Sequence, residues 1–203
     1  MNTVAVIDFE TTGISPGQGA RATEVAIVLL QEGRVVDRYQ SLMNAGVRIP
    51  SFITQLTGIS NAMMAQAPPA DQVMREAARF VGDAPMVAHN ASFDRKFWMA
   101  ELARAGQPAS QPYACTMLLA RRLYPQVPNH KLGTLVDYHG LPRTGTAHRA
   151  LADAEMAAQL LLQIVQDLQG RFALPRVDHP LLLALQQCQR HEMSTLMSRH
   201  ARA

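Results

Sequence analysis

The sequence predicts an α/β domain built on a mixed sheet of five strands with helices on its faces. Three observations predict this class. The first part of the chain reads as three consecutive strands with short connections, which is typical of an antiparallel meander. The remainder alternates helical patterns with two short apolar strands. The length of 203 residues is enough for one domain of about 150–200 residues and an appendage.

Turn residues separate the three strands of the expected meander. The first strand covers Val4–Phe9, and the glycines and proline of Thr11–Gly19 follow it as a turn. The second strand is the β-rich run Ala22–Gln31, which turns at Gly33. The alternating stretch Arg34–Met43 is expected to form the third strand.

Helices and two more strands follow the meander. Short buried strands are expected at Met86–Ala88 and Tyr113–Thr116. The helical segments are expected at Pro50–Ala65, as short turns, and at Ala70–Gly82, Ser92–Ala105, Met117–Tyr124, Lys131–Tyr138 and Ala147–Leu168. The domain is therefore expected to span residues 1–170.

Residues 171–203 are expected to form a linker and a C-terminal helical tail. Gly170–His179 reads as the linker, and Pro180 suits the first position of a helix that extends to about His200. An apolar stripe on this helix comprises Leu181, Leu182, Leu185, Met193, Leu196 and Met197. The stripe has two possible roles. It packs on its own domain, or it docks on a polymerase subunit or on a second copy of this chain.

Composition favours a cytoplasmic protein without a membrane partner. Hydrophobic residues make up 48% of the chain and charged residues 17%, which is ordinary for a globular domain. The two cysteines lack CxxC spacing, which fits a reducing compartment. Acidic residues interrupt the N-terminal apolar run, and no run approaches the ~20 residues of a membrane span. The net charge of +3 permits a polyanionic partner but does not demonstrate one.

Two carboxylates, Asp8 and Glu10, stand at the end of the first strand with only Phe9 between them. Strand residues i and i+2 point to the same side, so two like charges are brought together. A solvated strand end is one interpretation. The other is a site for a hard cation, because Mg²⁺ and Mn²⁺ bind carboxylate and phosphate oxygens.

The segment His89–Asp94 lies where a buried strand passes into a helix. Asn90 and Ser92 are suitable capping residues, and Asp94 falls in the first helical turn. Asp94 either complements the helix dipole or serves a ligand at the strand end, where open α/β sheets bind ligands. Phe93 reads as a packing residue that could also touch a ligand. We expect His89 to orient Asn90 or the backbone rather than to catalyse.

A third segment places His148 five residues before Asp153, which lies early in a helix. Five residues of a regular helix rotate by about 140°, so the two side chains would not share a face. They act together only if His148 lies on the loop or first turn. Otherwise they are a surface histidine and a first-turn acid. Imidazole can accept a proton from an attacking water near neutral pH.

Together the acids suggest metal chemistry. Four carboxylates can hold two divalent cations about 3.5–4 Å apart and stabilise both oxygens of a phosphoryl displacement. A site of four acids favours Mg²⁺ or Mn²⁺ over zinc.

These motifs, in this order, resemble those of the DnaQ-like DEDDh group of 3′–5′ exonucleases, which includes the proofreading ε subunit of bacterial DNA polymerase III and ribonuclease T. The matching motifs are Asp8-x-Glu10, His89-Asn90-x-x-Phe93-Asp94 and His148-x4-Asp153. The resemblance spans residues 4 to about 168 and implies a ribonuclease H-like fold. It also implies two divalent cations, Mg²⁺ or Mn²⁺, held by Asp8, Glu10, Asp94 and Asp153, with His148 as general base.

The resemblance also implies which residues contact a nucleic acid 3′ end. They are Thr11, Thr12, Gly13, Leu56, Ile59, Asn90 and Phe93. Thr57 stands where histidine is frequent in the family. Glu24 matches a common glutamate of the second strand, either near the 3′-terminal sugar or as a buried-edge acid.

The implied reaction is release of nucleoside 5′-monophosphates from a 3′ end. Single-stranded DNA or a frayed 3′ end is the favoured substrate, and RNA ends are the alternative. A nucleic-acid or polymerase-binding module without activity is the third reading.

Overall fold

The computed structural model describes residues 3–145 and 148–201 and contains a five-stranded sheet in the order β3-β2-β1-β4-β5. The meander consists of β1 (Val4–Thr11), β2 (Ala22–Gln31) and β3 (Arg34–Leu42), which pair antiparallel. The short strands β4 (Met86–Ala88) and β5 (Tyr113–Cys115) continue the sheet in parallel with β1. The predicted mixed sheet of five strands is therefore confirmed.

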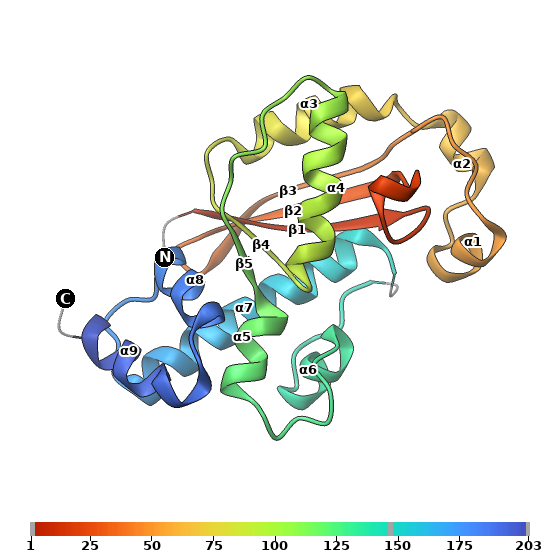
Figure 1. Ribbon diagram of the computed structural model, residues 1–203. Helices are drawn as coiled ribbons and strands as arrows, with labels where there is room; N and C mark the ends of the chain where they lie inside the picture. Colours follow the sequence, from red (N-terminus) through yellow and green to blue (C-terminus); the bar gives the residue numbers. More distant parts are fainter. Residues whose placement is uncertain (1–2, 146–147, 202–203) are drawn as a thin grey trace.

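Helices cover both faces of the sheet (Figure 1). One face carries α3 (Ala70–Val81) and α4 (Ala91–Arg104). The other carries α5, α6 and α7, which span Thr116–Leu123, Leu132–Tyr138 and Ala150–Phe172. The short helices α1 (Ser51–Thr57) and α2 (Asn61–Gln66) lie together at one end of the molecule.

The central strand β1 explains how the fold delivers acids to a site. Its side chains alternate between the two apolar layers, with Val4 and Val6 facing α7 and Ala5 and Ile7 facing α3 and α4. Asp8 and Glu10 continue the row that faces α7. Strand β1 is thus apolar on both faces along most of its length, and its acids lie at its C-terminal end.

Helix α7 differs from its predicted bounds at both ends. It begins at Ala150 rather than at residue 147, which lies outside the described residues, and it continues to Phe172. Ala173 ends it in the left-handed conformation with φ of 50°. The linker expected from Gly170 is therefore shorter, because the helix occupies its first three residues.

The tail forms two helices, so the prediction of one continuous helix is wrong. Helix α8 (His179–Gln187) starts where the Asp178 carboxylate accepts the Leu181 N–H, with the two atoms 3.0 Å apart. Helix α9 (Met193–His200) follows a short 3₁₀ turn at Arg190–Glu192, and reciprocal side-chain to backbone bonds between Gln189 and Glu192 begin that turn. The caps at Gln189 and Glu192 begin a new helical segment, although the apolar periodicity alone predicted one continuous helix.

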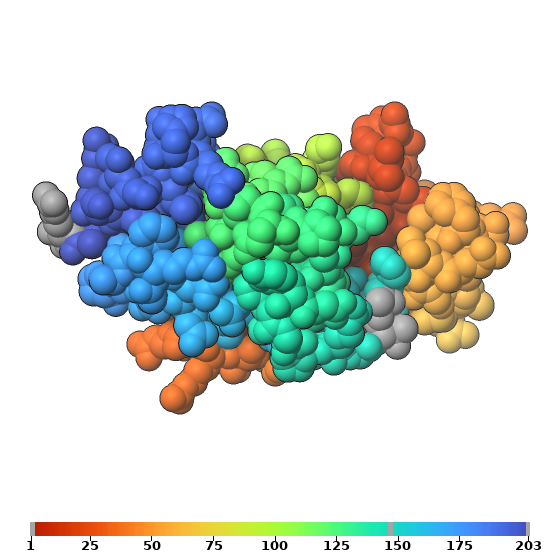
Figure 2. Space-filling model, turned by 90° about the horizontal axis from the view of Figure 1, so that it is seen from below, coloured from red at the N-terminus to blue at the C-terminus, as the bar shows by residue number. Residues whose placement is uncertain are grey.

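The tail packs on its own domain. The side chains of Leu181, Leu182, Leu185 and Met197 are buried in the same apolar layer as α5 and α7. Gln186 also closes the outer edge of the sheet, because its side-chain amide accepts the Cys115 N–H at 2.7 Å and donates to the Tyr113 carbonyl at 3.1 Å. Figure 2 shows the tail at the opposite end of the molecule from α1 and α2.

Two further expectations concern the whole chain. Among the described residues, no helix combines the length and apolar character that crossing a membrane requires. Cys115 and Cys188 are both free thiols.

Candidate active site

Asp8 and Glu10 stand at the mouth of the sheet, where β1 leaves the apolar core. Asp8 is half-buried, and Glu10 is only 9% exposed. Burial raises the pKa of Asp8 well above its usual value, and the charges of Asp94, Asp153 and Glu10 raise it further. Burial and the charge of Asp153 raise the pKa of Glu10 to about 8. The paired acids are therefore much less solvated than those of an ordinary strand end.

Asp94 reaches the same edge from the first turn of α4. Its side chain is 2% exposed and accepts the Phe9 N–H at 3.2 Å, so it is tied to β1 between the two acids of that strand. Burial raises the pKa of Asp94 to about 8. An acid that only complemented the helix dipole would remain solvated, so the position of Asp94 favours a ligand-binding role.

Asn90 was expected to cap helix α4 with its side chain, and this expectation is wrong. Asn90 precedes α4 in the left-handed conformation, with φ of 63°, and its side chain makes no capping bond to the helix. Instead its carbonyl accepts the Phe93 N–H at 2.8 Å. The Asn90 amide group is left exposed beside Ser92, whose hydroxyl donates to it at 3.4 Å.

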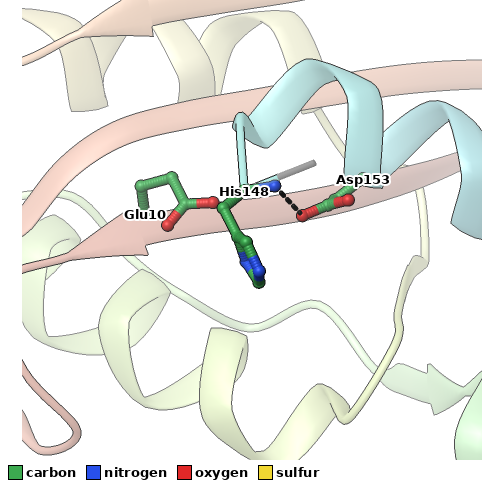
Figure 3. Close-up of side chains that lie close together, drawn as sticks. All are labelled: Glu10, His148 and Asp153. Atoms are coloured by element: carbon green, nitrogen blue, oxygen red, sulfur yellow. Dashed lines mark hydrogen bonds between the residues drawn. The ribbon is translucent and has the colours of Figure 1, made fainter. Parts of the chain in front are cut away.

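His148 lies on the loop before α7, and Asp153 lies in the first turn of that helix (Figure 3). The His148 N–H donates to an Asp153 carboxylate oxygen at 3.2 Å. A ring nitrogen of His148 and carboxylate oxygens of Glu10 and Asp153 all lie within 4.8 Å of one another. His148 adopts a φ of 61°, which is the left-handed region. The departure from helical geometry is what lets two residues five apart serve one site.

The donor chemistry of this cluster fits divalent metal ions. Glu10 and Asp153 come together with His148, and Asp8 and Asp94 stand at the same strand end but outside that group of three. Burial together with neighbouring acids raises the pKa of Asp8, Glu10 and Asp94. Like charges in a partly dry site are tolerable when cations are shared between them. Hard oxygen donors suit Mg²⁺ or Mn²⁺.

Glu24 also lies in the region of the site. No sequence pattern indicated its partner, Arg149. It lies opposite Glu10 in the β1–β2 ladder, is fully buried and pairs with the Arg149 guanidinium at 2.8 Å. Burial alone would raise the pKa of Glu24, but hydrogen bonds from Arg149, Gln40 and the Ala150 N–H lower it overall. The partner is 125 residues away in the chain, which is why local sequence reasoning missed it.

The Thr11–Gly13 turn is rigidly held beside the acids. The Thr11 hydroxyl donates to the Gly13 carbonyl at 2.7 Å, and the Thr12 hydroxyl accepts the Arg21 N–H at 3.0 Å. Arg21 is itself paired with the buried carboxylate of Glu101 at 2.8 Å. The turn therefore offers a fixed surface next to the strand end.

Leu56 and Ile59, which were both expected to contact substrate, differ in exposure. Leu56 is 52% exposed, and its side chain is available to a ligand. Ile59 is fully buried against Ile49, Ile53 and Met64, so its side chain has no exposed surface in this structure, and its contact with substrate stays a prediction.

Thr57, at the position where the family often has histidine, points inward. Its hydroxyl donates to the Ile53 carbonyl at 2.9 Å and accepts the Ile59 N–H at 3.1 Å. Phe93 is half-buried and packs against Phe97 with the two rings tilted and their centroids 5.0 Å apart. Phe93 therefore packs on the domain while keeping part of its surface free.

His89 is committed to structure. One ring nitrogen lies 2.9 Å from the Thr116 hydroxyl and the other 2.9 Å from the His130 carbonyl. Burial lowers the pKa of His89 to about 4, which disfavours its charged form. The ring links β4 to the start of α5 and to the loop before α6. Of the two expected partners, Asn90 or the backbone, it bonds the backbone, at the His130 carbonyl.

Comparison with known proteins identifies the family. A family model described as Exonuclease, of the RNase_T type, matches residues 5–161. The chain is 35% identical over 192 residues to the 3′-5′ exonuclease DinG of Bacillus subtilis, which covers 94% of this chain and 20% of that protein. It is 36% identical over 166 residues to a PolC-type DNA polymerase III of Bacillus cereus, covering 81% of this chain and 11% of that protein. The chain thus spans between about a tenth and a fifth of these relatives.

Solved structures share the fold. Exonuclease X in complex with 5′ overhanging duplex DNA is 26% identical, with a TM-score of 0.67, over 96% of this chain and 99% of that one. The nuclease domain of 3′hExo, a DEDDh family member bound to rAMP, is 19% identical, with a TM-score of 0.69, over 82% of this chain and 92% of that one. The matched sequence range and the sheet agree, and the chain belongs to the RNase_T exonuclease family.

Proposed function

We propose that this chain is a metal-dependent 3′–5′ exonuclease that releases nucleoside 5′-monophosphates from the 3′ end of DNA. The observation that carries the proposal is the convergence of Glu10, His148 and Asp153 within 4.8 Å. Asp8 and Asp94 stand at the same strand end, and Asp94 is bonded to the backbone between the two acids of β1. Carboxylates with one exposed imidazole form a donor set suited to phosphodiester hydrolysis.

The residues that would hold two divalent cations are Asp8, Glu10, Asp94 and Asp153. When bound, Mg²⁺ or Mn²⁺ supplies positive charge to the phosphoryl oxygens during displacement. We expect the backbone bond from His148 to Asp153 to persist, because it uses the amide and leaves the ring free.

In the proposed reaction, His148 receives a proton at a ring nitrogen from the attacking water. The water oxygen forms a bond to the terminal phosphorus, and the bond from phosphorus to the 3′ oxygen of the preceding nucleotide breaks. That oxygen then takes a proton from solvent. The exposed position of the His148 ring suits this exchange, because the histidine must return its proton to water after each cycle.

Single-stranded DNA or a frayed 3′ end is the substrate that we favour. The choice of DNA is supported by Exonuclease X, which was solved with 5′ overhanging duplex DNA, and by the sequence match to a 3′-5′ exonuclease and DNA polymerases. The choice of a single-stranded or frayed end rests on the resemblance to proofreading exonucleases. RNA is the second candidate, because a nuclease domain of the same fold was solved with rAMP. Stacking and backbone contacts distinguish the two sugars poorly unless a 2′-hydroxyl is probed.

A direct test uses 5′-labelled DNA and RNA oligomers of one sequence, with Mg²⁺, Mn²⁺ or EDTA. We expect a ladder of shortened DNA products with either metal and none with EDTA. Shortening of RNA alone would overturn the choice of DNA. The absence of any metal-dependent shortening on either strand would leave the inactive binding module as the better reading.

Replacing His148 with glutamine should remove most turnover and spare metal binding. Glutamine keeps a polar side chain of similar reach but cannot accept the proton, and loss of general-base catalysis costs about 10²–10⁴-fold. Gel assays measure the rate, and calorimetric titration with Mn²⁺ measures binding. If the variant loses Mn²⁺ binding together with activity, His148 acts as a metal ligand and its proposed role as general base fails.

Association with a polymerase subunit or a second copy would have to use surface outside the tail's buried leucines. Leu181, Leu182 and Leu185 are fully buried within the domain. A polymerase partner has support from the PolC-type relatives, in which the matching segment is about a tenth of a larger protein. Light scattering of the purified chain tests self-association directly.

A further inference from the structure

We propose that Glu24 and Arg149 form a clamp that positions His148 for proton transfer, so that both are positioning residues of the reaction. The inference rests on the proposed function, because it assigns His148 as the base. Neither residue is proposed to touch the substrate or the reacting atoms. Their task is to hold the backbone of the two residues that follow His148.

The clamp joins the sheet to the two residues that follow His148. Arg149 donates to both Glu24 carboxylate oxygens, through Nε at 3.1 Å and through a terminal nitrogen at 2.8 Å. The Ala150 N–H donates to the same carboxylate at 3.1 Å, and Gln40 of β3 donates to it at 2.7 Å. A planar guanidinium that spans both oxygens fixes direction as well as distance.

The position of His148 requires such a clamp. A non-glycine residue in the left-handed region is unfavourable and persists only where surrounding contacts determine it. Before the histidine, the Thr144 hydroxyl donates to the Ala152 carbonyl at 2.9 Å, which ties that part of the loop to α7. After the histidine, the contacts of Arg149 and Ala150 with Glu24 tie it to β2.

Other roles for Glu24 fit the contacts less well. Its side chain is 1% exposed, and both of its carboxylate oxygens already accept hydrogen bonds. A sugar contact needs exposed surface, and a metal ligand needs an oxygen lone pair directed toward the cation. The carboxylate instead directs its bonding capacity toward Arg149, Ala150 and Gln40.

The charges of Glu24 and Arg149 allow a measurement of Mn²⁺ binding to distinguish a positioning role from a role in metal binding. Arg149 and Glu24 are a neutral pair beside the acidic cluster. Removal of Arg149 leaves one more uncompensated negative charge near Glu10, which attracts cations rather than repelling them. A clamp therefore predicts that turnover falls while Mn²⁺ binding is kept or strengthened.

The test compares Arg149→Met and Arg149→Lys on a single-stranded DNA oligomer. We expect Arg149→Met to lower kcat by about 10–100-fold with KM changed less than about threefold, because small misplacement of a reacting group costs rate. Arg149→Lys should lie between this variant and the unchanged protein, since an ammonium keeps the charge but cannot span two oxygens. Calorimetric titration with Mn²⁺ is measured on every variant.

Arg38→Met provides a matched control. Arg38 pairs with Glu155 at 2.6 Å and also joins the meander to α7, but its side chain is 50% exposed and it lies outside the His148 loop. Its loss should change kcat less than about twofold, because exposed ion pairs contribute little. An effect equal to that of Arg149→Met would show that any link between the meander and α7 suffices, and the clamp would be refuted.

Amide hydrogen exchange at His148 and Ala150 gives a readout independent of activity. We expect both amides to exchange faster in Arg149→Met than in the unchanged protein, and Arg38→Met to leave them unaltered. An unchanged kcat, or a loss of kcat together with Mn²⁺ binding, would overturn the clamp. If the unchanged protein shortens no oligomer, the proposed function fails, while the exchange comparison still decides whether Glu24 and Arg149 hold the loop. If Arg149→Met does not fold, Arg149→Lys decides by the same measurements.

Discussion

Replacing Asp8 with asparagine should lower exonuclease turnover by about a thousandfold or more and should also raise the melting temperature of the metal-free protein. Asparagine keeps the shape of the side chain but removes the charge that would bind a cation. Charge stabilisation by bound metal is worth several kcal/mol, and each ~1.4 kcal/mol is a factor of ten in rate. The loss of activity therefore follows from a change that disturbs no packing.

The gain in stability has the same cause. Burial and four neighbouring acids raise the pKa of Asp8 well above its usual value, so its charged form is unfavourable in the folded protein without metal. Thermal unfolding at pH 8 with EDTA measures the effect, and gel assays with Mg²⁺ measure turnover.

Asp71→Asn is the matched control for this substitution. Asp71 lies on α3 with its side chain 49% exposed and pairs with Arg75 one helical turn away. Such surface pairs contribute little, so both turnover and melting temperature should stay nearly constant. A turnover above a tenth of normal in Asp8→Asn would contradict its role as a metal ligand. A lower melting temperature would contradict the account of repulsion.

The second large effect is a fall in the stability of the metal-free protein as pH rises from about 4.5 to about 8. Burial raises the pKa of Glu10 and of Asp94 to about 8 in the folded protein, from ordinary values of 4.5 and 3.8. Groups with a raised pKa hold more protons when folded than when unfolded. Folding therefore takes up protons, and stability is lost as pH rises toward the folded pKa.

The size of this fall can be set against measurement. Each unit of raised pKa corresponds to about 1.4 kcal/mol, and each kcal/mol shifts the melting temperature of a chain of this length by about 2–4 °C. We expect a drop of about 10 °C or more in EDTA and a much smaller one with excess Mg²⁺, because a bound cation favours the charged carboxylates. Melting curves across pH, with and without Mg²⁺, give the comparison. A melting temperature in EDTA that does not change with pH would show that the charged acids do not destabilise the folded protein.

Much of this fold follows from local sequence, and the reasons are physical. The alternating and β-rich runs of the meander predict their strands, because one strand carries its own burial pattern. The spacing of Asp8 and Glu10 places both on one side of β1 for the same reason. Asp94 and Asp153 sit at the starts of helices, where short motifs identify them.

Other features depend on partners that sequence separation conceals. The pairing of Glu24 with Arg149 joins residues 125 positions apart, and no periodicity reports it. The burial of Ile59 depends on Ile49 and Met64, which only the folded α1–α2 segment brings together. The break between α8 and α9 depends on side-chain caps that compete with a continuous apolar stripe.

Asp153 lies in the last long helix of the domain and His148 on the loop just before it, which has a consequence during synthesis. While the ribosome is still producing the chain, β1 and α4 can be complete and already present three of the four acids. The proton acceptor and the fourth acid arrive only when α7 docks against β1 and β2. Under the proposed mechanism, a nascent chain would therefore gain exonuclease activity only after α7 has docked on the sheet.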